Sequence, residues 1–398
     1  MMRIASSAFY QTAVNTIDNN QNTLAKLQTQ MSSSLRMQTA ADDPAAAGQV
    51  LGIDKSMSDV SQWQSNATAL NNSLGLEDNA LSAVTTALGQ IQTLALQANN
   101  ATLGASDRQA IAQQMQQQYN VLLQQANTQD SNGRYLFAGT NDGSAPFTQT
   151  ASGVSYGGNS NLRTLSVGPT SEIAAGDPGD AVFMQMRSGD GAISVGAASG
   201  NTGTASLTAA QVTDPTRWDS AAYTLSFSGG QYQVTDSSNT VISSGAYTAG
   251  TAIQFRGASV TLSGTPADGD SFSVGGSSTQ DLFSGVQNLI NLVKSPQTTA
   301  AQRAQTQTAM YGALQSLSGA QAQILSVQSG VGAREQSVTA TTTQLQARAT
   351  QLKSVLSSVQ DLDFAAATAE FSKTQLTLQA AEQSYVTIQG MSLFNYLK

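Results

Sequence analysis

The chain has 398 residues but only 17 basic and 25 acidic side chains, so 11% are charged against a usual fraction of about 25%. It contains neither cysteine nor histidine, which excludes disulfides, thiol chemistry, the serine-hydrolase triad and the usual zinc ligands. The net charge of −8 argues against a nucleic acid partner, and no stretch approaches the roughly 20 apolar residues of a membrane span. We therefore expect a structural protein, without enzymatic activity, cofactor or metal.

Proline and glycine divide the chain into three parts. Residues 45–145 and 297–398 contain no proline, so both stretches can form long helices. Of the 34 glycines, 22 lie between residues 139 and 276, where the composition favours strands and turns. This pattern predicts an α+β fold, in which a long antiparallel helical coiled-coil rod carries a β-rich insert.

We expect six segments along this rod and its insert. They are an N-terminal amphipathic assembly helix (1–42), the N-terminal half of the rod (43–139), a first small β unit (140–186), an inserted second β domain (187–278), the C-terminal half of the rod (279–360) and a C-terminal amphipathic assembly helix (361–398).

The first segment has an apolar stripe with a seven-residue spacing. Its members are Tyr10, Ile17, Leu24 and Met31, joined by Val14, Leu27 and Leu35. A solitary helix of this size is marginal in water, and nothing nearby in the sequence covers the stripe. We therefore expect it to pack on another helix.

The start of the long helical stretch is marked by Asp43 and Pro44. Aspartate is a good N-cap, and proline suits the first helical position because that position needs no backbone N–H. Asp42 adds favourable charge at the helix N-terminus. The alternative, a carboxylate pair for acid–base chemistry, is disfavoured because no partner base is available.

Heptads continue through the N-terminal half of the rod. Its apolar residues at intervals of seven are Ile53, Val60, Ala67, Leu74, Leu81, Leu88 and Ala95. Sustained sevens predict helices that supercoil on a partner. A third helix is expected over residues 107–130, with Ile111, Met115, Leu122 and Ala126 on its apolar face.

The insert contains β-rich runs. They are Leu162 to Val167, Tyr223 to Phe227, Tyr232 to Thr235, Thr251 to Phe255 and Val260 to Leu262. Residues 228–231 (Ser-Gly-Gly-Gln) predict a hairpin turn. The acidic pairs Asp177 with Asp180 and Asp268 with Asp270 are compatible with calcium binding, but turn formation is the favoured explanation.

The C-terminal flank repeats the pattern of the N-terminal flank. Its apolar residues at intervals of seven are Met310, Leu317, Ile324, Val331, Val338, Leu345, Leu352 and Val359. A final stripe comprises Phe364, Phe371, Leu378 and Tyr385. We expect Ile17, Leu24 and Met31 to face this stripe in the same chain or in a neighbouring subunit, and the arrangement between subunits is favoured.

Five sequence motifs resemble those of a known protein family. They are Met2-Arg3-Ile4, Ser34-Leu35-Arg36, Ala41-Asp42-Asp43-Pro44, Asn132-Gly133-Arg134-Tyr135-Leu136-Phe137-Ala138-Gly139-Thr140 and Ser392-Leu393-Phe394-Asn395-Tyr396-Leu397-Lys398. In their order and placement, the chain resembles the hook-associated protein 3 family, the second hook–filament junction proteins of the flagellin superfamily. One motif departs, because Ser34-Leu35-Arg36 replaces the family's more usual Gly-Lys-Arg.

The resemblance implies a structural adapter of the bacterial flagellum that joins the first junction protein to flagellin. It also implies type III export without a cleaved signal peptide, an extracellular location, homo-oligomerisation in a ring and masking by an export chaperone before secretion. Leu393, Phe394 and Leu397 join the terminal stripes as expected assembly residues. From charge and composition, we expect no nucleic acid or membrane partner.

Three alternatives stay open from the sequence. The chain could be a flagellin, which builds the filament itself, or an unrelated secreted rod or adhesin. An enzyme is the least favoured alternative because the chain contains only five glutamates for a carboxylate pair. The insert could bind glycans or host receptors, although decoration of the tube exterior is favoured.

Overall fold

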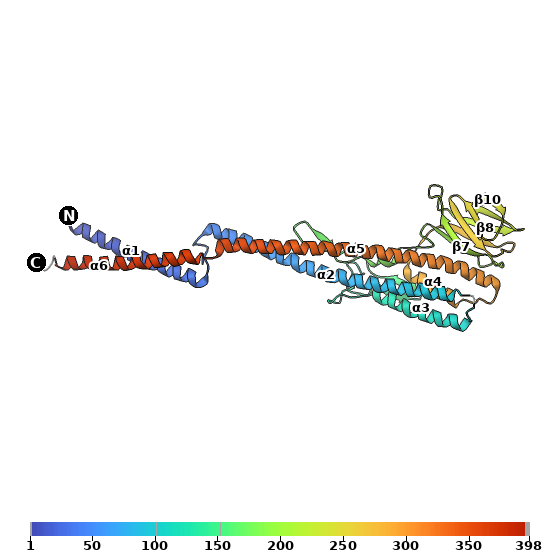
Figure 1. Cartoon of the computed structure of the whole chain (residues 1–398), viewed down its shortest axis with the longest axis horizontal. Coiled ribbons are helices and arrows are strands. Elements are labelled where there is room, and N and C mark those ends of the chain that lie inside the picture. The colour runs from blue at the N-terminus through green and yellow to red at the C-terminus, as the bar shows by residue number, and fades with distance from the viewer. Residues whose placement is uncertain (1, 101, 152, 395–398) are drawn as a thin grey trace. The chain divides into compact units, whose positions relative to one another are not determined.

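The computed structural model describes residues 2–100, 102–151 and 153–394, with side chains described from residue 8 onwards to 387 and at 389. The chain forms two compact units, drawn in Figure 1. The terminal unit comprises residues 1–65 and 342–398, and the central unit comprises residues 66–341. The division falls within two long helices.

Six α-helices account for the flanks of the described chain. They are α1 (Met2–Ser33), α2 (Pro44–Ala98), α3 (Ala105–Ala126), α4 (Leu282–Lys294), α5 (Ala300–Gln360) and α6 (Phe364–Phe394). Together with a β-rich middle, they confirm the predicted α+β class.

In the central unit, α2 and α5 run antiparallel. A Cβ on Gly75 would lie 3.8 Å from Glu335 Oε1, and Gln92 Nε2 donates to Ser318 Oγ at 3.3 Å. The heptad residues Leu74, Leu81 and Leu88 of α2 are buried. So are Leu317, Ile324 and Val331 of α5. The seven-residue spacing therefore marks the contact face of each helix here.

The helix α4 is a feature that the sequence analysis missed. Residues 279–360 were expected to form one half of the rod, but α4 ends at Lys294 before α5 begins at Ala300. Asp281 caps α4 by accepting from the Ser284 N–H at 2.7 Å. Pro296 falls between the two helices, where it cannot interrupt either one.

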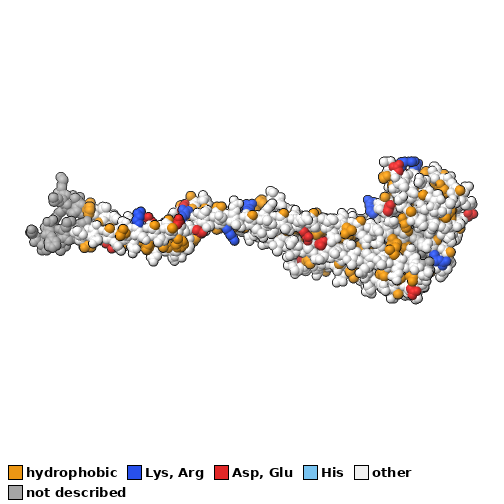
Figure 2. Space-filling model, viewed as in Figure 1, with side chains coloured by type: hydrophobic (Ala, Val, Ile, Leu, Met, Phe, Trp, Pro, Cys, Tyr) orange, Lys and Arg blue, Asp and Glu red, His pale blue; other side chains and the backbone are white. Residues whose placement is uncertain are grey.

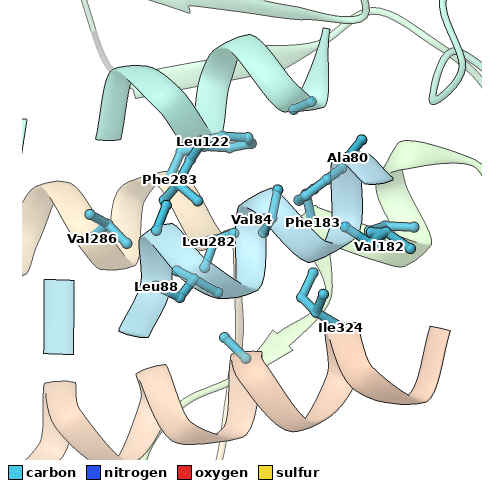
Figure 3. Close-up of a cluster of buried hydrophobic side chains, with 14 of the residues drawn as sticks. Ala80, Val84, Leu88, Leu122, Val182, Phe183, Leu282, Phe283, Val286 and Ile324 are labelled. Carbon is cyan, nitrogen blue, oxygen red and sulfur yellow. The ribbon is translucent and has the colours of Figure 1, made fainter. Parts of the chain in front are cut away.

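The central core joins the helices to the first β unit. Figure 3 shows side chains from both parts in contact: Ala80, Val84, Leu88, Leu122, Val182, Phe183, Leu282, Phe283, Val286 and Ile324. Phe283 packs against Phe147 and Phe183, with ring centroids 5.3 and 5.9 Å away. The described residues of the range 140–186 therefore share one core with the helices.

The first β unit contains two small sheets and a π-helical turn. Its strands are β1 (Phe147–Thr150), β2 (Gly153–Tyr156), β3 (Thr164–Ser166) and β4 (Glu172–Ala174), and the turn is η1 (Asp180–Met184). β1 pairs antiparallel with β2, and β3 pairs antiparallel with β4. A third pair, β5 (Met186–Arg187) with β14 (Thr279–Gln280), closes the two ends of the β domain, residues 187–278.

The β domain consists of two antiparallel sheets around its own core. Its strands are β6 (Ile193–Ala197), β7 (Ser206–Val212), β8 (Tyr223–Ser228), β9 (Gln231–Asp236), β10 (Val241–Ala246), β11 (Ala252–Phe255), β12 (Ala258–Ser263) and β13 (Ser271–Gly276). One sheet has the order β10-β9-β8-β13-β6 and the other has the order β11-β12-β7. Leu225, Val260 and Phe272 are fully buried in the core that the strands share.

The β8–β9 hairpin forms where the sequence predicts it. Ser228 pairs with Gln231, and Gly229 and Gly230 adopt φ values of +58° and +73°. Positive φ at both central residues defines the type I′ turn, which glycine tolerates without steric cost. Side chains of α5 anchor the domain: Thr308 Oγ1 accepts from the Leu207 N–H at 3.0 Å, and Gln305 Nε2 donates to the Asn201 carbonyl at 2.7 Å.

Candidate assembly site on the terminal helices

In the terminal unit, α1 and α6 lie side by side as an antiparallel pair (Figure 1). The rings of Tyr10 and Tyr385 meet edge to face with centroids 6.0 Å apart. At the other end of the pair, Leu35 and Asp361 form an isolated antiparallel bridge. With equal rise along both helices, this register places Ile17 level with Leu378, and Leu24 level with Phe371.

The predicted stripes therefore meet each other within one chain. Their half-buried members are Tyr10, Ile17, Leu24, Met31, Phe371, Leu378 and Tyr385. Ala367 and Thr374 are buried between them. This arrangement is the alternative in which the two stripes pair within the same chain.

Two predicted residues, Val14 and Phe364, lie outside the contact between the helices. Val14 was assigned to the stripe but is 39% exposed, because Ala13 and Asn20 take the intervening positions facing α6. Phe364 keeps the seven-residue spacing yet is 47% exposed at the start of α6. The side chains of Leu393 and Phe394, and the whole of Leu397, lie outside the described residues.

The outward face of the pair carries large apolar side chains that the sequence analysis missed. Phe9 is 59% exposed, Leu376 69% and Val386 66%. Figure 2 shows apolar patches on a surface that is mostly uncharged and polar. Their positions in the sequence could have identified them. They are large apolar residues outside the heptad positions, and a helix pair exposes the side chains at such positions.

The loops at the base of the pair are joined by Arg36. Its Nη2 donates to the Val359 carbonyl at 2.9 Å, and its backbone N–H donates to the Gln360 carbonyl at 2.8 Å. The Leu362 N–H donates in turn to the Ser34 carbonyl at 3.0 Å. The segment after α1 is thus tied to the segment between α5 and α6.

Ser34 explains part of the sequence motif in which it lies. Its φ is +61°, in the left-handed region of backbone conformation that residues other than glycine rarely adopt. Glycine is the residue best suited to this conformation. The usual Gly-Lys-Arg of the family that the sequence resembles therefore fits the backbone here, and this chain places a serine in the same turn.

The aspartates near this base have structural roles. Asp43 Oδ1 accepts from the Ala46 N–H at 3.0 Å and caps α2, with Pro44 as the first helical residue. Asp363 Oδ1 caps α6 by accepting from the Ala365 and Ala366 N–H groups. Neither arrangement leaves a carboxylate pair poised for acid–base chemistry.

Asp42 serves the loop and not the helix dipole. Its Oδ1 lies 2.9 Å from Lys26 Nζ of α1, and its Oδ2 accepts from the Gln38 and Thr39 N–H groups. The Lys26 ammonium, followed by these N–H donors, holds the pKa of Asp42 far below its ordinary value of 3.8. The charged form of Asp42 is therefore the form that fastens the loop to α1.

In the β domain, the acidic pair Asp268 and Asp270 binds backbone N–H groups of neighbouring loops. Asp270 is buried and accepts from the backbone N–H groups of Thr202, Gly203 and Ala267. Asp268 accepts from the Gly229 N–H at 2.7 Å. Within the described residues, no group of three or more acidic side chains could hold a metal ion, and no helix is long and apolar enough to cross a membrane.

The motif at residues 132–140 also has a structural explanation. Leu136, Phe137 and Ala138 are buried, and the Phe137 carbonyl accepts from the Gly179 N–H at 2.8 Å and from the Tyr156 hydroxyl at 3.0 Å. Gly139 has a φ of +67°, and a Cβ there would lie 2.2 Å from the Asn159 carbonyl oxygen. The motif therefore packs the first β unit against the helices.

Three family models match the chain. Residues 4–142 match the bacterial flagellin N-terminal helical region, and residues 314–397 match the C-terminal helical region. Residues 197–276, within the β domain, match the D2-like domain of flagellar hook-associated protein 1. The two flagellin regions thus contain the terminal helices, and the hook-associated region covers most of the β domain.

Curated relatives include flagellar hook-associated protein 3 from Salmonella typhimurium and from Escherichia coli. Each is 34% identical over 187 residues, which span 47% of this chain and 58% of the relative.

The chain is also similar to solved structures, and these matches cover almost the whole length of each solved chain. FlgL from Xanthomonas campestris is 32% identical, with 77% of this chain and 99% of that chain covered and a TM-score of 0.73. Hook-associated protein 3 from Legionella pneumophila is 31% identical, with coverage of 77% and 98% and a TM-score of 0.74. A structure described as the flagellar junction protein FlgL from the same organism is 32% identical, with coverage of 73% and 99% and a TM-score of 0.69. The chain belongs to the flagellar hook-associated protein 3 (FlgL) family.

Proposed function

We propose that the chain is a structural adapter that joins the hook to the flagellin filament of the bacterial flagellum. The family assignment supports this role, and it favours a junction protein over flagellin itself. The single observation that carries the mechanism is the terminal unit. Both ends of the chain form one helix pair whose inner face is covered and whose outer face presents Phe9, Leu376 and Val386.

The assembly contacts follow from that outer face. Exposed apolar side chains of this size gain free energy when a neighbour covers them, at about 25 cal/mol per Å² of buried apolar surface. The low charge of the chain limits electrostatic repulsion between copies. We therefore assign packing between subunits to the outer face and pairing within the chain to the heptad residues.

The proposed partners are copies of the chain and two other flagellar proteins. Copies of the chain would form a ring, with the first junction protein on one side and flagellin on the other. The β domain, whose residues 197–276 match a domain of hook-associated protein 1, would decorate the exterior of the junction.

Before secretion, we propose that an export chaperone covers the apolar residues of α6. The protein would then leave the cell by type III export without a cleaved signal peptide. In a binding assay with the full chain and its chaperone, Phe371→Asp and Leu378→Asp should reduce affinity at least tenfold. Thr377→Asp, on the exposed side of the same helix, is the matched control. Undiminished binding by both heptad variants would rule out this assignment.

The assembly role is tested by substitutions on the outer face. Leu376→Ser and Val386→Ser should leave the circular dichroism spectrum unchanged, because both side chains are exposed in the free chain. Motility and filament attachment should fall sharply in cells that carry the double variant. Leu325→Ser, an exposed position on α5 of the central unit, serves as the control. Normal filaments on cells with the double variant would contradict the proposed face.

A further inference from the structure

A buried carboxyl group lies in the central unit, where α2, α5 and the first β unit meet. Glu77 occupies the side of α2 that faces the core, and its side chain is 0% exposed. Its Oε1 accepts from the Asp177 N–H at 2.9 Å. Its Oε2 is buried without a hydrogen-bond partner among the described residues. An unpartnered buried carboxylate oxygen is costly, so this group needs an explanation.

The charges around Glu77 do not balance if it is ionised. Asp177 forms a two-point ion pair with Arg334 of α5, in which the Arg334 Nη2 and Asp177 Oδ2 atoms are in contact. One guanidinium thus faces one carboxylate already. A second negative charge at Glu77 would be buried and uncompensated, which is strongly unfavourable because the side chain is shielded from water.

Other charged groups on the surrounding elements already have partners or neighbours of their own. Asp78 accepts from Gln328, Glu335 lies beside Gly75, Asp180 accepts from Ser160, Arg163 pairs with Asp142, and Arg134 pairs with Asp130. The balance at Glu77 is therefore set mainly by burial, by Asp177 and by Arg334.

The same place fastens a loop to the helices. Ser73, one helical turn before Glu77, donates from its hydroxyl to the Ala175 carbonyl at 2.7 Å. Gly176 lies against Glu77, since a Cβ there would be 3.4 Å from Oε2 and 3.5 Å from the Leu136 carbonyl oxygen. Residues 175–177 are thus held by α2 on one side and by Arg334 of α5 on the other.

We propose that Glu77 is protonated in the folded protein and forms, with Asp177 and Arg334, a proton-dependent latch that holds residues 175–177 against α2 and α5. In acidic and neutral solution the latch is closed, because Glu77 is neutral and Asp177 alone balances Arg334. In alkaline solution Glu77 loses its proton, the second carboxylate repels Asp177, and the loop is released. This inference does not depend on the proposed role at the flagellar junction.

The direction of the pH effect follows from linkage. Burial, followed by the neighbouring Asp177 carboxylate, raises the pKa of Glu77 from 4.5 to about 8. Between these values the folded chain holds a proton that the unfolded chain has lost. The equilibrium therefore shifts toward the open state by up to about tenfold per pH unit over this range, and the effect levels off above the folded-state pKa.

Hydrogen exchange measures the latch directly in the full-length protein. After correction for the intrinsic exchange rate, a peptide that covers residues 173–180 should lose protection at least tenfold between pH 6 and pH 9. In Glu77→Gln, which mimics the neutral carboxyl group, protection of the same peptide should stay constant. Glu335→Gln, on α5 near the latch, should follow the wild-type profile. Identical profiles for wild type and Glu77→Gln would overturn the proposal.

An infrared measurement keeps the proposal testable if Glu77→Gln does not fold. The wild-type protein should show the C=O stretching band of one protonated carboxylic acid at pH 7, because exposed carboxyl groups are ionised at this pH and do not contribute to the band. The band should disappear as the pH rises to 9.5. Its absence at pH 7 would overturn the proposal.

Discussion

At the residue scale, single positions hold turns that join the elements. Gly139 is the clearest case, because its φ of +67° and its distance to Asn159 leave no room for a side chain. We expect Gly139→Ala to lower the free energy of unfolding by at least about 2 kcal/mol, from backbone strain plus a steric clash. Urea unfolding would measure the change. Gly143→Ala is the control, since no atom lies within 4 Å of its would-be Cβ. Equal stability of the two variants would show that the turn relaxes.

Asp42 supplies a second prediction at this scale, in the acidic range. Its pKa is depressed in the folded state, so its contribution to stability is present above its ordinary pKa of 3.8 and is lost as the pH falls below that value. Asp42→Asn should lower the thermal midpoint at pH 7, and the difference from wild type should shrink below pH 3.8. Asp59→Asn, which breaks an exposed pair with Lys55, should have little effect at any pH. A pH-independent difference for Asp42→Asn would refute this account of the loop.

At the element scale, the sequence predicted the helices better than it predicted their faces. Periodicity identified the buried sides of α2 and α5, because sevens persist over many turns. Periodicity did not separate α4 from α5. The short linker between them contains a single proline, Pro296, which is equally compatible with the start of one long helix. Periodicity also assigned Val14 to the face that contacts α6. An apolar residue four positions after Tyr10 can lie on the contact face or just beside it, and Val14 is exposed.

The candidate site was predicted only in part, for a related reason. Heptads identify the residues that pair within the chain, such as Leu24 and Phe371. They do not identify exposed residues such as Leu376, whose role depends on a neighbour absent from the sequence pattern. Similarly, Glu77 lies in a heptad helix and is polar, so only its packing against Asp177 distinguishes it from a surface glutamate.

The core shared by helices and first β unit gives a prediction at the same scale. Phe283 of α4 is fully buried and contacts the rings of Tyr119, Phe147 and Phe183. Phe283→Ala should cost about 3–5 kcal/mol of stability through lost burial and a residual cavity. Chemical unfolding would measure this loss. Leu325→Ala, at a half-exposed position of α5, should change stability by less than about 1 kcal/mol. Comparable losses would mean that α4 contributes little to the core.

At the scale of the whole molecule, the two units divide the work. The terminal unit exposes apolar side chains from both ends of the chain, which suits packing against copies and neighbours. The central unit is held by two cores: one shared by its helices and the first β unit, and one inside the β domain. Under the proposed function, substitutions at Leu376 and Val386 should therefore impair assembly and leave the folding of the central unit intact.

The location of the protein on intact flagella tests the central claim most directly. Gold-labelled antibodies against the β domain should mark a single narrow band between hook and filament when viewed by electron microscopy. Labelling along the length of the filament would contradict the adapter role and identify the chain as a filament subunit.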